Sequence, residues 1–230
     1  LLFTRRLMTW LSAHTSSGKL FEIDLRLRPD GNTGLLVSPF DAFARYQRNE
    51  DGLGAWPWEH QALTRARYSA GDSEIGERFE AERTLILMQR RDKQKLCTDV
   101  LQMRARMLDG HPNPTGLFDV KHDRGGMVDV EFIVQFLVLA HAHEHAELVR
   151  NVGNIALLHM AGQLQLIDTP LAREVADAYR TFRSIQHRLR LNAAERARVA
   201  PQEVERDAAA VTRLWNSVFT PLPEATVSAP

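Results

Sequence analysis

Apolar and polar residues alternate with a period of two near the start of the chain, which predicts a β-strand over residues 20–28. One face would carry Phe21, Ile23, Leu25 and Leu27, and the other Glu22, Asp24, Arg26 and Arg28. Pro29-Asp30-Gly31 is typical of a turn, and residues 34–37 can return as a second short strand. The pattern therefore predicts a small β-hairpin.

Elsewhere the apolar residues recur at helical spacing. We expect helices at residues 2–14, 39–49, 58–68, 73–88, 92–109, 127–144, 153–165, 169–192 and 201–219. Ser38 is a suitable N-cap for the second of these, because Pro39 fits the first helical position. Strand signals nearly vanish after about residue 90. The expected fold class is mainly α with a small β-hairpin, an α+β chain.

This change of pattern predicts two domains and a tail. Residues 1–90 mix helix and hairpin, residues 91–220 form a helical bundle, and residues 221–230, rich in proline and small residues, are expected to be disordered. A hairpin is only marginally stable alone, so the first part should complete a larger sheet. The chain begins at Leu1 rather than methionine, and we expect it to be a fragment.

Composition narrows the class of protein. The 29 basic and 29 acidic residues balance, whereas general nucleic-acid binders usually carry a basic excess, so no nucleic-acid partner is expected. No apolar run approaches the roughly 20 residues that a membrane span requires, so no membrane partner is expected either. The single cysteine, Cys97, excludes an internal disulfide framework. We expect a cytoplasmic protein.

The polar face of the predicted strand carries the sharpest chemical signal. Asp24 stands beside Arg26 and Arg28, about 7 Å apart for each pair of residues. Carboxylates that hold Mg²⁺ and arginines that bind phosphate are the combination that phosphoryl and nucleotidyl transfer need. A solvated sheet face with cross-strand ion pairs explains the same pattern, and periodicity alone favours that simpler interpretation.

A family resemblance adds to this pattern. Residues 16–31 resemble the strand-and-turn motif of the glutamine synthetase adenylyltransferases, in which aspartate is followed by Arg-Leu-Arg-Pro, a small residue and glycine. Further blocks that resemble the family follow in order at residues 34–38, 43–50, 58–63, 65–67, 118–121, 125–126 and 129–133. Residues 15–18 and 58–61 resemble the C-terminal, transferase half of these bifunctional proteins.

The resemblance implies a partial polymerase-beta-like nucleotidyltransferase domain followed by a helical bundle domain. It implies that Asp24 is a catalytic, metal-binding carboxylate, and that Arg26, Arg28 and Arg65 bind nucleotide. The Asp-x-Asp motif that supplies the other metal ligands in the family is absent from these 230 residues. One carboxylate cannot organise a two-metal site, so we expect the fragment alone to lack catalysis.

Three further groups have competing interpretations. Arg65, seven residues after Trp58, would share a helix face with it and either reach phosphate or extend into solvent. Glu131 lies on an apolar helix, and we hypothesise that it pairs with Lys121 or a strand arginine and so joins the two domains. Asp129 is interpreted as first-turn charge that complements the helix dipole.

The remaining motifs favour ordinary structural roles. Gly125-Gly126 before a helix could bind an anion, although a plain turn fits it better. His141 and His145 have the spacing of a zinc site, but a solvated helix end is the favoured interpretation. A basic stripe is a solvated face or a docking surface for an acidic partner or nucleotide; it comprises Arg180, Arg183, His187 and Arg190.

The functional hypothesis that the resemblance implies is transfer of AMP from ATP to a tyrosine of glutamine synthetase, with Mg²⁺, in the regulation of nitrogen assimilation. The alternative within the same class is phosphorolytic removal of AMP. The alternative from another class is a non-catalytic helical module that binds glutamine synthetase or a PII-type signalling protein.

Overall fold

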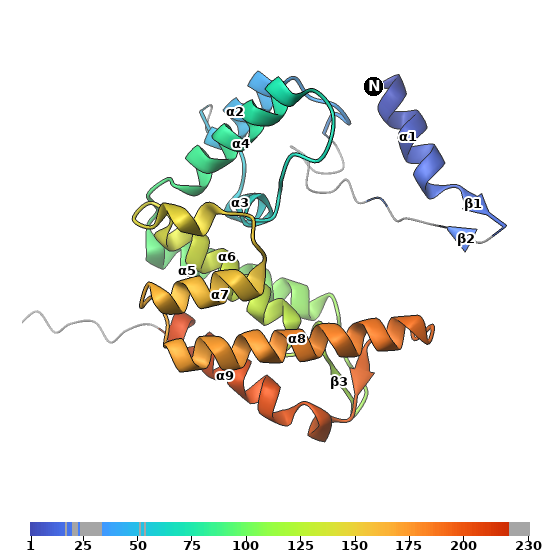
Figure 1. The fold of residues 1–230 in the computed structure, drawn as a ribbon, viewed down its shortest axis with the longest axis vertical. Helices are drawn as coiled ribbons and strands as arrows, with labels where there is room; N and C mark the ends of the chain where they lie inside the picture. The colour runs from blue at the N-terminus through green and yellow to red at the C-terminus, as the bar shows by residue number, and fades with distance from the viewer. Residues whose placement is uncertain (17, 20–22, 24–33, 51, 53, 221–230) are drawn as a thin grey trace, which may run out of the picture. The chain divides into compact units, whose positions relative to one another are not determined.

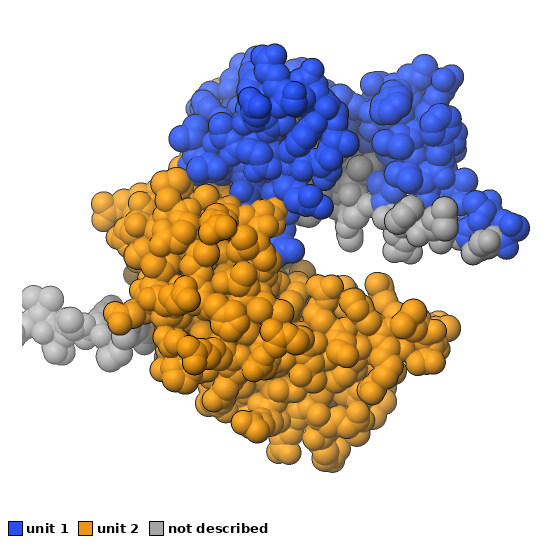
Figure 2. Space-filling view, viewed as in Figure 1, with its two compact units in different colours: residues 1–86 blue, residues 87–230 orange. Residues whose placement is uncertain are grey.

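The computed structural model describes residues 1–16, 18–19, 23, 34–50, 52 and 54–220. The chain is mainly helical, with short two-stranded pieces of sheet. It divides into two compact units, Leu1–Ile86 and Leu87–Pro230 (Figures 1 and 2). No helix in the described part of the chain is long and apolar enough to cross a membrane.

Unit 1 begins with helix α1 (Leu2–Ser12), which buries none of its residues. Strands β1 (His14–Thr15) and β2 (Gly18–Lys19) pair antiparallel. They precede the predicted strand, most of which lies outside the described residues. Residues 34–37, predicted to return as its partner, are described and form bends rather than a strand. That part of the hairpin prediction is wrong.

Helices α2 (Phe40–Arg48), α3 (Pro57–Leu63) and α4 (Ser73–Leu87) follow in unit 1. The N-cap of α2 is Pro39 rather than Ser38, because Pro39 has an extended backbone (φ −57°, ψ 144°). Asn49 ends α2 in the left-handed region, at φ 57°, and its Oδ1 accepts a hydrogen bond from Gly54 N at 2.6 Å. The loop to α3 is thereby closed locally.

Unit 2 is a helical bundle built around α6 (Met127–His141). This helix packs against α5 (Lys93–Asp109), α7 (Asn154–Gln163), α8 (Thr169–Leu191) and α9 (Glu205–Phe219). Apolar side chains project from nearly all sides of α6. The helix is therefore most stable at the centre of the bundle, where other helices cover it. Asp92 caps α5 and Asp168 caps α8 through backbone N–H groups.

A short antiparallel ladder closes one end of this bundle. Strand β3 (Phe118–Asp119) pairs with β4 (Arg198–Val199), so that Asp119 lies opposite Arg198. The 3-10 helices Ala146–Val149 and Pro201–Glu203 connect neighbouring elements. The ladder brings together two segments about 80 residues apart in the chain, and no periodic pattern in the sequence indicates it.

Candidate functional site

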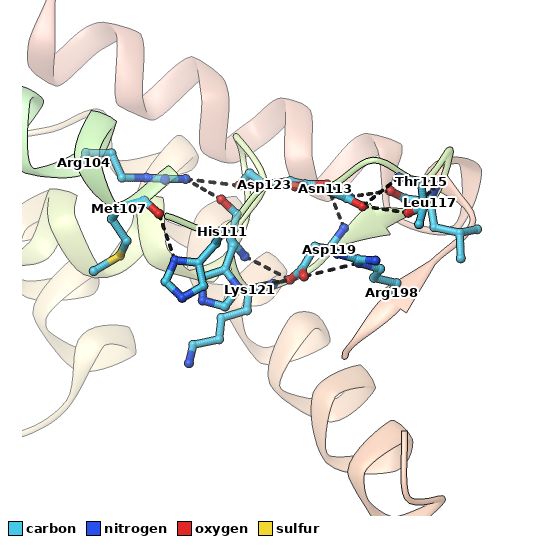
Figure 3. A network of polar contacts seen from close by, with 11 residues as sticks. Arg104, Met107, His111, Asn113, Thr115, Leu117, Asp119, Lys121, Asp123 and Arg198 are labelled. Atoms are coloured by element: carbon cyan, nitrogen blue, oxygen red, sulfur yellow. Dashed lines mark hydrogen bonds and ion pairs between the residues drawn. The ribbon is translucent and has the colours of Figure 1, made fainter. Parts of the chain in front are cut away.

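The most elaborate polar arrangement in unit 2 surrounds Asp119, at the end of β3 (Figure 3). Asp119 is only 3% exposed. Its Oδ1 accepts hydrogen bonds from the backbone N–H groups of Lys121 at 3.0 Å and His122 at 3.1 Å. Its Oδ2 lies 3.6 Å from Nε of Arg198 on the paired strand. The carboxylate therefore closes the turn after β3 and holds it to β4.

Asp123 reinforces the same turn from the other side. Its Oδ2 accepts from the backbone N–H of Asp119 at 2.8 Å and from Nδ2 of Asn113 at 2.7 Å. Asn113 also donates to the carbonyl of Leu117 at 2.8 Å. These hydrogen bonds join the segment before β3 to the segment after it (Figure 3). They also fix the backbone at Lys121.

Gly125 and Gly126 form the entry to α6 rather than an open anion site. Gly125 has φ +82°, and a Cβ there would lie 2.7 Å from the carbonyl oxygen of Ala208 in α9. Its N–H donates to Asp129 Oδ2 at 2.6 Å, and the N–H of Gly126 donates to the carbonyl of Asp123 at 3.0 Å. Both donors are used within the protein, so the plain-turn interpretation applies.

Asp129 carries more than first-turn helix charge. It is 2% exposed and forms an ion pair with the fully buried Arg104 of α5, with 2.5 Å between Nε and Oδ1. Arg104 also donates to the carbonyl of His122 at 2.8 Å. The pair links α5, the β3–α6 turn and the start of α6. Sequence reasoning missed Arg104 because an arginine on an amphipathic helix ordinarily faces solvent.

Glu131 has a different partner from the one predicted. The hydroxyl of Tyr179 on α8 donates to its Oε1 at 3.0 Å, and Nδ2 of Asn154 donates to that hydroxyl at 2.9 Å. Glu131 is half-buried, and within the described residues no salt bridge joins it to Lys121. Burial raises the pKa of Tyr179, and the Glu131 carboxylate raises it further. The interdomain role of Glu131 and Lys121 stays a prediction.

A polar cavity of about 320 Å³ opens beside this turn, and we call it the β3–α8 cavity. The charged residues on its wall come from the end of β3 and the turn after it, from the end of α8 and from the loop before β4. They are Asp119, Lys121, His122, Arg190, Glu195 and Arg196. Arg190 belongs to the basic stripe noted in the sequence, and Lys121 was singled out there for another role.

The pKa of the histidine in this cavity is lowered by its surroundings. His122 stacks on His111 with 4.1 Å between ring centroids and 8° between planes. Burial lowers the pKa of His122, and positive charge from His111, Lys121 and Arg196 lowers it further, against the opposing effect of Asp119. The electrostatic environment at His122 therefore disfavours an additional positive charge.

In unit 1 the three helices after the predicted strand are joined by charged contacts. Arg48 of α2 donates from Nε to Glu82 of α4 at 2.6 Å, and Glu82 is buried. The hydroxyl of Tyr46 donates to Glu59 of α3 at 3.0 Å. Arg83 donates to the carbonyls of Leu63 at 2.7 Å and Thr64 at 3.0 Å. These contacts hold α2, α3 and α4 in one arrangement.

The residues predicted for the nucleotide site are only partly visible in this arrangement. Asp24, Arg26 and Arg28 lie outside the described residues. Arg65 is exposed, two residues beyond the end of α3 at Leu63. The prediction that it shares a helix face with Trp58 is wrong, because the helix ends before it.

The other histidine motif gives no metal site in the described part of the chain, where no group of three or more His, Cys, Asp or Glu side chains could hold a metal ion. His141 Nδ1 instead lies 3.4 Å from Nζ of Lys93. Burial lowers the pKa of His141 to about 4, and the Lys93 ammonium contributes to that shift.

Two family models match the chain in succession. The model described as glutamate-ammonia ligase adenylyltransferase matches residues 1–82, and the model described as GlnD PII-uridylyltransferase matches residues 100–216. Both families are named for nucleotidyl transfer, adenylyl in one and uridylyl in the other. The chain therefore falls in the class of nucleotidyltransferase-related proteins.

Curated relatives narrow this class. The chain is 58% identical over 94% of its length to a bifunctional glutamine synthetase adenylyltransferase/adenylyl-removing enzyme of Bordetella bronchiseptica. It is 55% identical over 94% of its length to one of Burkholderia mallei, and 50% identical over 91% to one of Nitrosomonas eutropha. The chain belongs to the glutamine synthetase adenylyltransferase family. It spans 22–24% of the length of these relatives.

Proposed function

We propose that the chain is part of an enzyme that transfers AMP from ATP to a tyrosine of glutamine synthetase and so regulates nitrogen metabolism in the cytoplasm. The observation that carries this proposal is the 58% identity, over 94% of the chain, to a relative named for that activity. The Asp24-Leu25-Arg26-Leu27-Arg28-Pro29 run would supply one metal-binding carboxylate and two phosphate-binding arginines for such a transfer. We infer transfer rather than removal of AMP because residues 15–18 and 58–61 resemble the transferase half of the family. The relative is named for both activities, and phosphorolytic removal of AMP is the alternative within this class.

The roles of the site residues follow from the family resemblance and from their charge. Arg26, Arg28 and Arg65 would bind the phosphates, since a guanidinium pairs with phosphate through two parallel hydrogen bonds. Residues 1–90 would then be the later part of a polymerase-beta-like nucleotidyltransferase domain. Within this part, the contacts of Arg48 with Glu82 and of Tyr46 with Glu59 hold the helices after the strand in one arrangement.

Mg²⁺ fits the donor chemistry of Asp24, because a carboxylate oxygen is the ligand type that this ion takes. A bound Mg²⁺ would neutralise charge on the phosphates during transfer. A single carboxylate makes an incomplete site, and the described residues add no cluster of metal ligands. The remaining ligands would come from other parts of the parent protein.

The test replaces Asp24 in the full-length parent. Asp24→Asn should lower AMP transfer from ATP to glutamine synthetase at least about 100-fold, because loss of a second-shell group alone costs 10- to 100-fold at metal sites. Asp41→Asn is the matched control, since Asp41 is exposed and pairs with Arg78 at 2.7 Å. Transfer activity retained by Asp24→Asn would remove this residue from the metal site.

A second candidate function is an interaction module. It is favoured by the match of residues 100–216 to a family named for a PII-modifying enzyme and by the self-contained core of unit 2. The partner would be glutamine synthetase or a PII-type protein. Calorimetric titration of the 230-residue chain with each protein, without ATP, tests it, and absence of saturable heat with both would exclude it.

A further inference from the structure

We propose that the β3–α8 cavity in unit 2 binds a small anion that carries a phosphate group. Its volume of about 320 Å³ lies in the range of small-molecule sites in proteins. All of its lining residues belong to unit 2, so the proposal does not depend on the nucleotide-binding roles of Arg26, Arg28 and Arg65.

Three cations on the cavity wall are available to a ligand. Lys121, Arg190 and Arg196 come from three different segments, and among the described residues none of them forms a salt bridge. Lys121 and Arg190 are exposed, and Arg196 is exposed as well. Three unpaired cations that converge on one concave surface attract an anion and raise its local concentration.

The acidic residues on the wall do not neutralise these cations. The Asp119 carboxylate already accepts two backbone N–H groups and faces Arg198 at 3.6 Å. Only Glu195 remains as an uncommitted carboxylate on the wall within the described residues. Three free cations against one free carboxylate leave an excess of positive charge.

A buried polar atom in the same place has no hydrogen-bond partner. Nδ1 of His122 is inaccessible to solvent, and it lies 3.5 Å from Asp119 Oδ1 without forming a hydrogen bond. Buried polar atoms are nearly always satisfied, and Nδ1 of His122 is one of five exceptions among the described residues. It therefore adds to the argument only together with the three cations. Burial is the main cause of the lowered pKa of His122, and positive charge from His111, Lys121 and Arg196 lowers it further.

A phosphate group matches this arrangement better than a single carboxylate. It carries a charge of about −1.5 to −2 at neutral pH and three acceptor oxygens, enough for one ammonium and two guanidinium groups. Glu195 could accept a hydrogen bond from a hydroxyl of an esterified ligand. Inorganic phosphate and the phosphate of a nucleotide share this chemistry, and the experiment distinguishes the two sources.

The test is calorimetric titration of the 230-residue chain at fixed ionic strength with inorganic phosphate, AMP, adenosine and citrate. We expect saturable binding of phosphate or AMP and none of adenosine. Tighter binding of AMP would indicate a nucleotide, and equal binding would indicate the free ion. Arg190→Gln and Arg196→Gln should each weaken binding at least about tenfold, because each removes a charge-assisted hydrogen bond.

Arg188→Gln is the matched control, since it makes the same charge change two residues away on α8 and does not line the cavity. It should change affinity less than about twofold. Arg26→Gln should also leave phosphate and AMP binding at this cavity unchanged. A failure of the cavity proposal can therefore be told apart from a failure of the proposed enzyme function. Circular dichroism must show each variant folded. Equal weakening by Arg188→Gln and Arg190→Gln, tighter binding of citrate, or no saturable phosphate or AMP binding would overturn the proposal.

Discussion

At the scale of single residues, the Arg104–Asp129 ion pair is the most consequential contact of unit 2. Both side chains are removed from solvent, and the pair joins α5 to the first turn of α6. Desolvation makes such a pair costly to form. It makes the loss of one partner costlier still, because the remaining charge stays buried.

Asp129→Ala should therefore lower the free energy of unfolding by about 3–5 kcal/mol. Urea denaturation followed by circular dichroism measures this change. Asp177→Ala is the control, because Asp177 pairs with Arg180 on the exposed face of α8 and such pairs contribute about 0–1 kcal/mol. Similar losses of unfolding free energy in the two variants would show that the buried pair contributes no more to stability than the exposed pair.

His141 makes stability depend on pH. Its pKa is lowered to about 4, mainly by burial and then by Lys93, with Glu144 opposing and His145 and His143 adding to the shift. A histidine whose pKa falls on folding binds its proton more readily in the unfolded chain. The stability that depends on the neutral ring is thus lost as the pH falls from about 6.5 towards 4.

The expected result is that His141→Gln loses less stability than the parent between pH 6.5 and pH 4. Thermal unfolding midpoints of both proteins across that window provide the measurement. His187→Gln, at an exposed position of α8, serves as the control. Parallel pH profiles for His141→Gln and the parent would contradict the assignment.

At the scale of elements, the turn into α6 determines how that helix meets α9. Gly125 has a left-handed backbone and lies close to Ala208 of α9. A side chain at this position would therefore be strained by the φ angle and would collide with α9.

Gly125→Ala should destabilise unit 2 by about 1–3 kcal/mol, since an alanine would be strained at this φ and would contact the α9 backbone. Gly110→Ala provides the comparison. Gly110 has φ −73°, and a Cβ there would approach no atom closer than 3.5 Å. That variant should be neutral or slightly stabilised. Thermal melts of both variants measure these changes. A Gly125→Ala variant as stable as the parent would contradict the expected destabilisation.

At the scale of the whole molecule, unit 2 has a core of its own. Helix α6 is covered by α5, α7, α8 and α9, all of which belong to residues 87–220. The aromatic rings of Phe136 and Phe219 meet across α6 and α9 with centroids 5.0 Å apart.

Residues 87–220 expressed alone should therefore unfold in one cooperative transition. Calorimetry and dispersed amide resonances in NMR spectra measure this. A non-cooperative transition with a collapsed spectrum would show that the core needs residues from unit 1.

Much of the helical content follows directly from the sequence. The predicted helices 73–88, 92–109 and 169–192 differ from α4, α5 and α8 by one residue at an end, because a long amphipathic repeat and a strong cap are local signals. The short elements were less predictable. The helix predicted over 58–68 ends at Leu63, and β3 and β4, each two residues long, leave no pattern of their own.

The sequence by itself determined the positions of the long helices and, through several short motifs spread over residues 16–133, the family. Only the tertiary structure decided which polar groups meet. Arg104 and Asp129 are 25 residues apart, and Tyr179 and Glu131 are 48 apart. Periodicity shows which face of a helix is apolar, but the partner of a buried charge depends on how separate elements pack. The β3–α8 cavity exists for the same reason, because its cations come from segments that only folding brings together.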